Sequence, residues 1–234
     1  MTANPDGALN LIFDADDTLW DSNIHFLEAE AAFHESLARA EIRDKQAIRA
    51  TMRRHELRII ESHGYGRRPY IMALHQAAIE LAQAHHHENL RAEVERIAGK
   101  LIDRHCELLP GVEPTLTELA RRHRLLLFTK GDPGEQLRKL DRSGLRHLFS
   151  RIGVPAEKHP ENYRLLIAQA ELDPARTFMI GNSPRSDINP ALKAGLRAVF
   201  IPHPHTWELE HEDIDHTNER VVTITAFPQL REVF

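Results

Sequence analysis

Apolar residues follow two different spacings along this chain, and the change from one to the other divides the sequence. A short apolar run at residues 9–13 predicts a strand. From about residue 21 to about 108, apolar residues recur at helical spacing without a convincing strand signal. After Pro110, short apolar runs alternate with amphipathic stretches, which is typical of βαβ units. Further strands are expected at 124–128, 151–154, 177–180, 198–201 and 221–224, and helices near 112–122, 133–143, 161–171 and 185–194.

The two patterns together predict an α/β fold, with a doubly wound parallel sheet and an inserted all-helical domain. Residues 1–20 and 109–234 would form the α/β core, and residues 21–108 the helical insertion. The chain has 234 residues, of which 41% are apolar, so it can bury the cores of one large domain or two modest ones.

Composition excludes several classes of protein. Acidic and basic residues are interspersed and the formal net charge is -5, so a nucleic acid is not an expected partner. The single cysteine, Cys106, excludes an intramolecular disulfide and a thiol metal cluster. Residues 1–7 have neither a basic start nor a long apolar stretch, and no apolar run approaches the roughly 20 residues of a membrane span. We therefore expect a cytoplasmic protein without membrane contact.

Polar residues follow four of the predicted strands, at the edge where parallel sheets bind ligands. Aspartates there could simply cap a turn or the next helix. However, Asp14, Asp16 and Asp17 place three carboxylates in four residues, and their repulsion favours a hard divalent cation such as Mg²⁺. The candidate residues, in chain order, are Asp14, Asp16, Thr18, Thr129, Lys130, Lys158, Asn182 and Asp187.

The order of these groups, with Asp-x-Asp-x-Thr opening the series, resembles the haloacid dehalogenase superfamily, whose members are mostly phosphatases. The resemblance covers nearly the whole chain and is close to a largely uncharacterised subgroup. It implies a Rossmann-like core, a helical cap domain at 21–108, Mg²⁺ as cofactor and a small phosphorylated metabolite as substrate. Only Asp14, Asp16 and Thr18 satisfy the spacing of the first motif, which leaves Asp17 as a supporting or structural acid.

The resemblance also implies roles for the first-motif residues. Asp14 would attack phosphorus to form an aspartyl-phosphate and would bind Mg²⁺ through its carboxylate. Asp16 would protonate the leaving group and then activate water, while its backbone carbonyl ligates the metal. Because dehalogenating relatives lack this second acid, its presence favours a phosphorylated substrate over a carbon–halogen bond.

The later motifs are expected to bind the phosphoryl group and the metal. Thr129 and the backbone N–H of Lys130 would bind phosphoryl oxygens, and Lys158 would neutralise them. Taken alone, a threonine at a strand end may be only a cap and a loop lysine is usually solvated. In the fourth motif Asn182 stands where many relatives have an acid, so Asp187 is the expected direct ligand, with Asn182 and Thr18 in support.

Substrate specificity is expected to lie in the helical insertion. Tyr65, Arg67 and Arg68 follow flexible glycines, and the arginines could meet an anionic substrate. The alternative is an ordinary helix–helix connection with solvated arginines. Histidines at 85–87, and His203 with His205, lack the spaced partners of a zinc site, so zinc is not expected.

The resulting hypothesis is a Mg²⁺-dependent hydrolase of a small phosphomonoester. A phosphotransferase or phosphomutase acting on a sugar phosphate would share Asp14 and Asp16 and is the first alternative. A non-catalytic binding module is the second, but binding alone requires no general acid such as Asp16. The sequence leaves open whether the protein is a monomer or a homodimer.

Overall fold

The computed structural model describes residues 7–85, 89–105 and 107–234. It divides into two compact units, one of Met1–Asn23 with Cys106–Phe234 and the other of Ile24–His105. The predictions made for residues 1–6, for His86 and His87, and for Cys106 lie outside the described residues.

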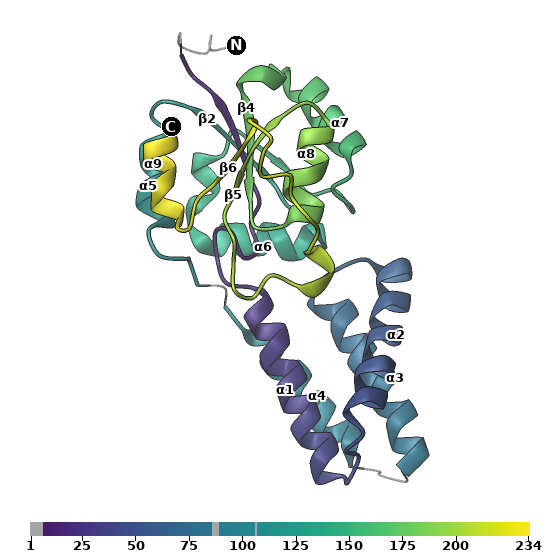
Figure 1. Ribbon diagram of the computed structural model, residues 1–234. Helices are drawn as coiled ribbons and strands as arrows, with labels where there is room; N and C mark the ends of the chain where they lie inside the picture. The colour runs from purple at the N-terminus through teal and green to yellow at the C-terminus, as the bar shows by residue number, and fades with distance from the viewer. Residues whose placement is uncertain (1–6, 86–88, 106) are drawn as a thin grey trace. The chain divides into compact units, whose positions relative to one another are not determined.

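The first unit is built on a six-stranded parallel sheet with the order β3-β2-β1-β4-β5-β6 (Figure 1). Along the chain, β2 and β3 extend the sheet on one side of β1, and β4 to β6 extend it on the other. The strand order therefore reverses between β1 and β4, and ligands bind beyond such a switch point in open α/β sheets. The predicted α/β class is confirmed. The strands are β1 Asn10–Phe13, β2 Arg124–Phe128, β3 Arg151–Gly153, β4 Thr177–Gly181, β5 Arg197–Phe200 and β6 Val221–Thr223.

Helices connect the strands. Asp132 begins α6 by accepting a hydrogen bond from the N–H of Glu135 (2.7 Å), and Gly144 ends it with φ 73° in the left-handed region. The main helices are α5 Val112–Leu119, α6 Pro133–Ser143, α7 Pro160–Ala170, α8 Asn189–Lys193 and α9 Leu230–Val233. The shorter turns are η1 Leu145–Leu148, η2 Pro174–Arg176, η3 Pro184–Ile188, η4 Glu208–Glu210 and η5 Phe227–Gln229.

The expected single helix near 185–194 is instead two elements. Its first part, η3, is a π-helical turn, and only the second part, α8, is an α-helix. The N–H groups of Asp187 and Ile188 both donate to the carbonyl of Ser183 (2.9 and 3.1 Å), which widens the turn. Such turns are frequent at functional sites, and this one carries Asp187.

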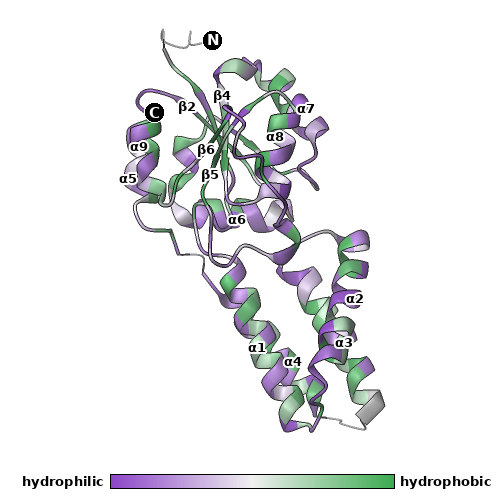
Figure 2. Ribbon diagram, viewed as in Figure 1, coloured by the Kyte–Doolittle hydropathy of each residue, from purple (hydrophilic) through white to green (hydrophobic). Residues whose placement is uncertain are grey.

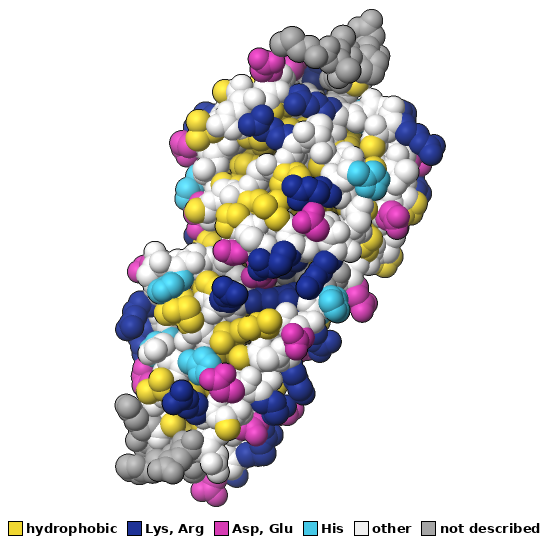
Figure 3. All heavy atoms as spheres, turned by 180° about the vertical axis from the view of Figure 1, so that it is seen from behind, with side chains coloured by type: hydrophobic (Ala, Val, Ile, Leu, Met, Phe, Trp, Pro, Cys, Tyr) yellow, Lys and Arg dark blue, Asp and Glu magenta, His cyan; other side chains and the backbone are white. Residues whose placement is uncertain are grey.

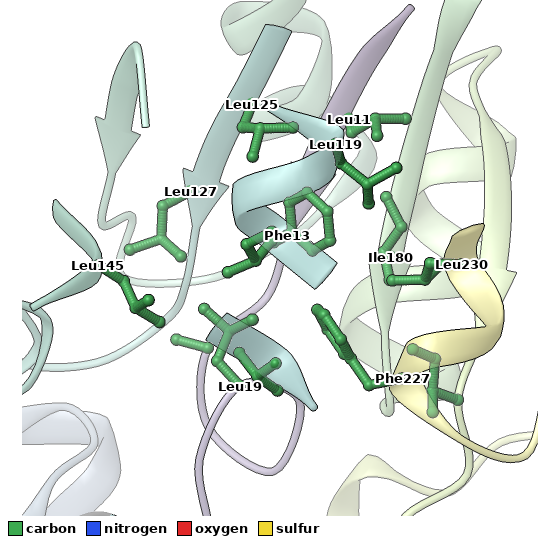
Figure 4. Packing of buried hydrophobic residues seen from close by; sticks show 14 of the residues in the cluster. Leu11, Phe13, Leu19, Leu119, Leu125, Leu127, Leu145, Ile180, Phe227 and Leu230 are labelled. Carbon is green, nitrogen blue, oxygen red and sulfur yellow. The ribbon is translucent and has the colours of Figure 1, made fainter. Parts of the chain in front are cut away.

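Both faces of the sheet are covered. Successive residues of a strand point to opposite faces. Leu11 and Phe13 pack with α5 and the C-terminal segment (Figure 4), whereas Ile12 packs on the other face with residues of α7. The rings of Phe13 and Phe227 lie 5.9 Å apart within the first of these clusters. Burial on both faces explains why the inner strands β1, β2 and β4 are largely apolar, as Figure 2 shows.

The second unit consists of helices around its own apolar core. Phe33, Leu74, Val94 and Ile97 are among the buried residues that hold it together. Its helices are α1 Asn23–Arg39, whose first residue belongs to the other unit, α2 Lys45–His63, α3 Arg67–His85 and α4 Leu90–Asp103. None of the helices in the described part of the chain is long and apolar enough to cross a membrane. Charged side chains of both signs are scattered over the face of each unit that Figure 3 shows.

Ile12 occupies the centre of the sheet and is fully buried, so Ile12→Ala should lower the free energy of unfolding by about 2–5 kcal/mol. Leu165 on α7 is 57% exposed, and Leu165→Ala should change it by less than about 0.5 kcal/mol. Urea denaturation of both variants measures the two values. Similar losses for the two variants would contradict this description of the core.

Candidate functional site

A buried ion cluster lies at the carboxyl end of the central strands. Asp14 directly follows β1, and its N–H donates to the carbonyl of Ile180 in β4 (2.9 Å). The ammonium of Lys158 lies 2.5 Å from Oδ1 of Asp14 and 2.7 Å from Oδ1 of Asp187. All three side chains are buried. The structure thus brings together the residues expected from the first, third and fourth motifs.

The electrostatics of this cluster are unbalanced. Burial and the neighbouring Asp187 raise the pKa of Asp14 to about 7, although Lys158 opposes them. Burial also raises the pKa of Asp187, again against Lys158. Burial alone would lower the pKa of Lys158, but the two carboxylates outweigh it and raise that pKa above its usual range. Two carboxylates facing one ammonium leave a negative charge, which suits a further cation, and a hard ion prefers such oxygen donors.

Asp187 reaches the cluster because of two features of the fourth motif. The N–H of Ser183 donates to Oδ2 of Asp187 (3.0 Å), which orients the carboxylate. Gly181 ends β4 without a side chain, and a Cβ atom there would overlap the Asp187 carboxylate. Tyr163 of α7 also donates to the carbonyl of Ser186 (2.8 Å), which ties the π-helical turn to the core.

Thr18 and Asn182 lie beside Asp14. The hydroxyl of Thr18 is 3.3 Å from Oδ2 of Asp14 and 3.2 Å from Oδ1 of Asn182. The amide nitrogen of Asn182 donates to Oγ1 of Thr206 in the connection after β5 (2.9 Å). Both predicted supporting residues are therefore in contact with each other, and Thr18 also contacts the candidate nucleophile.

Thr129 and Lys130 follow β2 as predicted. Thr129 is buried, and its N–H donates to the carbonyl of Gly153 at the end of β3 (3.1 Å). The Lys130 ammonium binds Oε1 of Glu210 (2.6 Å) and Oγ of Ser186 (3.2 Å). Burial alone would raise the pKa of Glu210, but Lys130 and hydrogen bonds to serines outweigh it and lower that pKa. The Lys130 side chain thus serves to hold loops together.

Asp16 has different surroundings from Asp14. Its carboxylate receives hydrogen bonds from Lys139 (2.9 Å to each oxygen), from Gln136 (2.8 Å) and from the indole of Trp20 (2.7 Å). Burial would raise the pKa of Asp16, but Lys139 and these hydrogen bonds outweigh it and hold the pKa below its usual range. The sequence did not lead us to Gln136 and Lys139, the two residues of α6 that bind Asp16. They are three residues apart on a helix and therefore lie on the same face of it, which is the sequence pattern that could have indicated them.

A separate group of possible metal ligands comprises Asp17, Asp21 and His203. Nε2 of His203 lies 3.2 Å from Oδ1 of Asp21. Burial raises the pKa of Asp17 to about 7, while its Oδ1 accepts hydrogen bonds from the N–H groups of Ser22 (2.8 Å) and Asn23 (3.1 Å). These bonds fit the expectation that Asp17 is a supporting or structural acid.

The three candidate substrate residues of the helical unit differ in exposure. Arg67 is buried, and its Nη1 donates to the carbonyls of Ile102 (3.3 Å) and Arg104 (2.7 Å) near the end of α4. These contacts favour a structural role for Arg67 over the predicted substrate contact, and they also differ from the solvated arginine of the alternative. Tyr65 is half-buried and Arg68 is exposed, and their contact with a substrate stays a prediction.

Comparisons with known proteins point to one family. A family model described as haloacid dehalogenase-like hydrolase matches residues 10–195. Phosphoserine phosphatase of Thermus thermophilus is 34% identical over 104 residues, which are 42% of each chain. Glyceraldehyde 3-phosphate phosphatase of Methanothermobacter thermautotrophicus is 28% identical over 130 residues, 53% of this chain and 57% of that one. This chain therefore matches only about half the length of these curated relatives.

A solved structure extends the likeness to the whole chain. The crystal structure of a haloacid dehalogenase-like family hydrolase from Xanthomonas campestris is 28% identical to this chain, with a TM-score of 0.82. The match covers 97% of this chain and 95% of that chain. The likeness therefore includes both units of the structure.

The raised pKa of Asp14 predicts how stability depends on pH in the absence of metal. Folded Asp14 holds a proton up to about pH 7, whereas unfolded Asp14 loses it near 3.8, so stability should fall as the pH rises through this window. In Asp14→Asn the ammonium of Lys158 faces one carboxylate, so the fall should be smaller. Urea denaturation of both proteins in EDTA, at about pH 5 and about pH 8, gives the fall in the free energy of unfolding between the two pH values. Equal falls in both proteins would contradict the charge imbalance.

Proposed function

Because the chain belongs to the haloacid dehalogenase-like hydrolase family, we propose that it is a Mg²⁺-dependent phosphatase that hydrolyses a small phosphomonoester. The observation that carries this proposal is the buried contact of Lys158 with both Asp14 and Asp187. The matched relatives named above are phosphatases of small phosphorylated molecules, which supports the same substrate class.

In the proposed first step, a carboxylate oxygen of Asp14 attacks phosphorus, and the bond between phosphorus and the ester oxygen breaks. Lys158, whose ammonium contacts the Asp14 carboxylate, would hold the attacking group and neutralise phosphoryl charge. The hydroxyl of Thr129 and the N–H of Lys130 would bind the other phosphoryl oxygens. The products are an aspartyl-phosphate on Asp14 and the free alcohol.

The metal would be held by the carboxylates of Asp14 and Asp187 and by the backbone carbonyl of Asp16, with the amide oxygen of Asn182 in support. These are the oxygen donors that Mg²⁺ prefers, and their charge matches the imbalance of the buried cluster. When bound, Mg²⁺ supplies positive charge beside the phosphoryl group.

Asp16 is proposed to transfer protons in both steps. It would give a proton to the departing ester oxygen and then take one from the water that attacks the aspartyl-phosphate. Its contacts with Lys139 and Gln136 favour the ionised form, which is the form that takes the proton from water. In the first step, by contrast, Asp16 must begin in the protonated form, because it gives its proton to the leaving group.

Asp14→Asn should lower phosphate release from an aryl phosphate by about 10³-fold or more, because the amide cannot act as the nucleophile. Release by the wild type should also require Mg²⁺. Asp141→Asn is the matched control, because the Asp141 carboxylate is exposed and pairs with Arg146 on the surface of α6, away from the buried cluster. Equal rates for wild type and Asp14→Asn would remove Asp14 from the mechanism. Transfer to an added sugar acceptor without free phosphate would assign a phosphotransferase instead.

Asp16→Asn should lower kcat/KM for an alkyl phosphate by about 10²–10⁴-fold and for a nitrophenyl phosphate much less. An alkoxide needs a proton as it leaves, whereas a nitrophenolate does not. Because kcat/KM covers only steps up to the first irreversible one, it separates leaving-group protonation from the later attack by water. Steady-state kinetics with the two esters measures the ratio, and an equal loss for both would deny Asp16 the role of general acid.

A further inference from the structure

The connection between β5 and β6 is bound to several parts of the α/β unit, the fourth motif among them. The side chain of Asn23 donates to the carbonyl of His205 (2.6 Å). Glu210 accepts hydrogen bonds from Ser183 (2.5 Å) and from Lys130 (2.6 Å). Thr206 lies between these two anchor points, so the backbone on both sides of it is fixed to the α/β core.

The two ends of the Asn182 amide have different partners. Its oxygen is 3.2 Å from the hydroxyl of Thr18, which also lies 3.3 Å from the Asp14 carboxylate. Its nitrogen donates to Oγ1 of Thr206 over 2.9 Å. Asn182 is only 6% exposed, so these two hydroxyls, rather than solvent, are the hydrogen-bond partners of its amide.

An asparagine at this position needs such a partner more than an aspartate would. A carboxylate presents an oxygen whichever way it is turned, whereas an amide presents an oxygen at one end and two N–H donors at the other. With the amide reversed, N–H donors would face the Asp14 side of the site and repel a cation. An acceptor at the nitrogen end is therefore needed to keep the N–H group hydrogen-bonded while the oxygen of Asn182 faces the cation site.

We propose that Thr206 is a positioning residue for the cation site, because its hydroxyl accepts from the N–H end of the Asn182 amide while the oxygen end lies beside Thr18, toward Asp14. The proposal rests on the Mg²⁺ site of the proposed function and deepens it. Partners that orient metal-supporting side chains in this way typically change metal affinity about 10–100-fold.

The test is the dissociation constant of Mg²⁺ measured by calorimetry on the full chain without substrate. Thr206→Val keeps the shape but removes the acceptor, and it should weaken Mg²⁺ binding about 10-fold. Thr206→Ser keeps the hydroxyl and should stay within about 2-fold of wild type. Thr217→Val is the matched control, because Thr217 lies in the same connection but its hydroxyl binds Asp215, and it should leave the constant unchanged.

Repeating the Thr206 substitution in an Asn182→Asp variant makes the test specific for the orientation of the amide. In Asn182→Asp no amide needs turning, so adding Thr206→Val should change the Mg²⁺ constant by less than about 2-fold. Circular dichroism and thermal unfolding check that each variant folds, and Thr206→Ala replaces Thr206→Val if the latter does not.

Three results would overturn the proposal. Unchanged Mg²⁺ binding in Thr206→Val would do so, and so would an equal loss in the wild-type and Asn182→Asp backgrounds, since that would show a merely structural role. A wild type that binds no Mg²⁺ would overturn the cation site itself together with this inference. Normal wild-type binding with an unaffected Thr206→Val would overturn the role of Thr206 alone and leave the proposed function intact.

Discussion

The ammonium of Lys158 lies buried between the carboxylates of Asp14 and Asp187, and the arrangement of the α/β unit depends on bringing these three groups together. They come from the ends of different strands and from a helix start, so no local segment could assemble them. Parallel pairing of β1 with β4 places Asp14 near the fourth motif, and the capped start of α7 follows Lys158 closely. A free carboxylate left in such a cluster is costly, which makes the site a natural place for a cation.

Asp14 and Asp16 are only two residues apart, yet their environments shift their pKa values in opposite directions. Asp14 shares one ammonium with a second buried carboxylate, whereas both oxygens of Asp16 bind Lys139 and accept further hydrogen bonds from Gln136 and Trp20. Enzymes commonly assign different tasks to neighbouring acids by this means. The proposed division between nucleophile and proton carrier is consistent with that contrast.

Much of this arrangement could be predicted from the sequence. The apolar runs predicted the strands, and because parallel strands end at one edge, the polar residues after them were expected to meet there. Lys139 and Gln136 could not be singled out, since polar residues on an amphipathic helix are usually solvated. Thr206 lies in a connection without periodic pattern, and only three-dimensional contacts relate it to Asn182. The π-helical turn was missed because its residues fit a regular helix equally well by spacing.

The position of β1 in the middle of the sheet has a consequence for how the chain folds during synthesis. Asn10 pairs with Arg124 on one side and with Thr177 on the other, so the strand made first must wait for partners made much later. Helices α2, α3 and α4 of the second unit, in contrast, pack on their neighbours in sequence, so these pairs can form while the ribosome is still at work. Until β4 is made, β1 therefore lacks one of its two neighbours in the sheet.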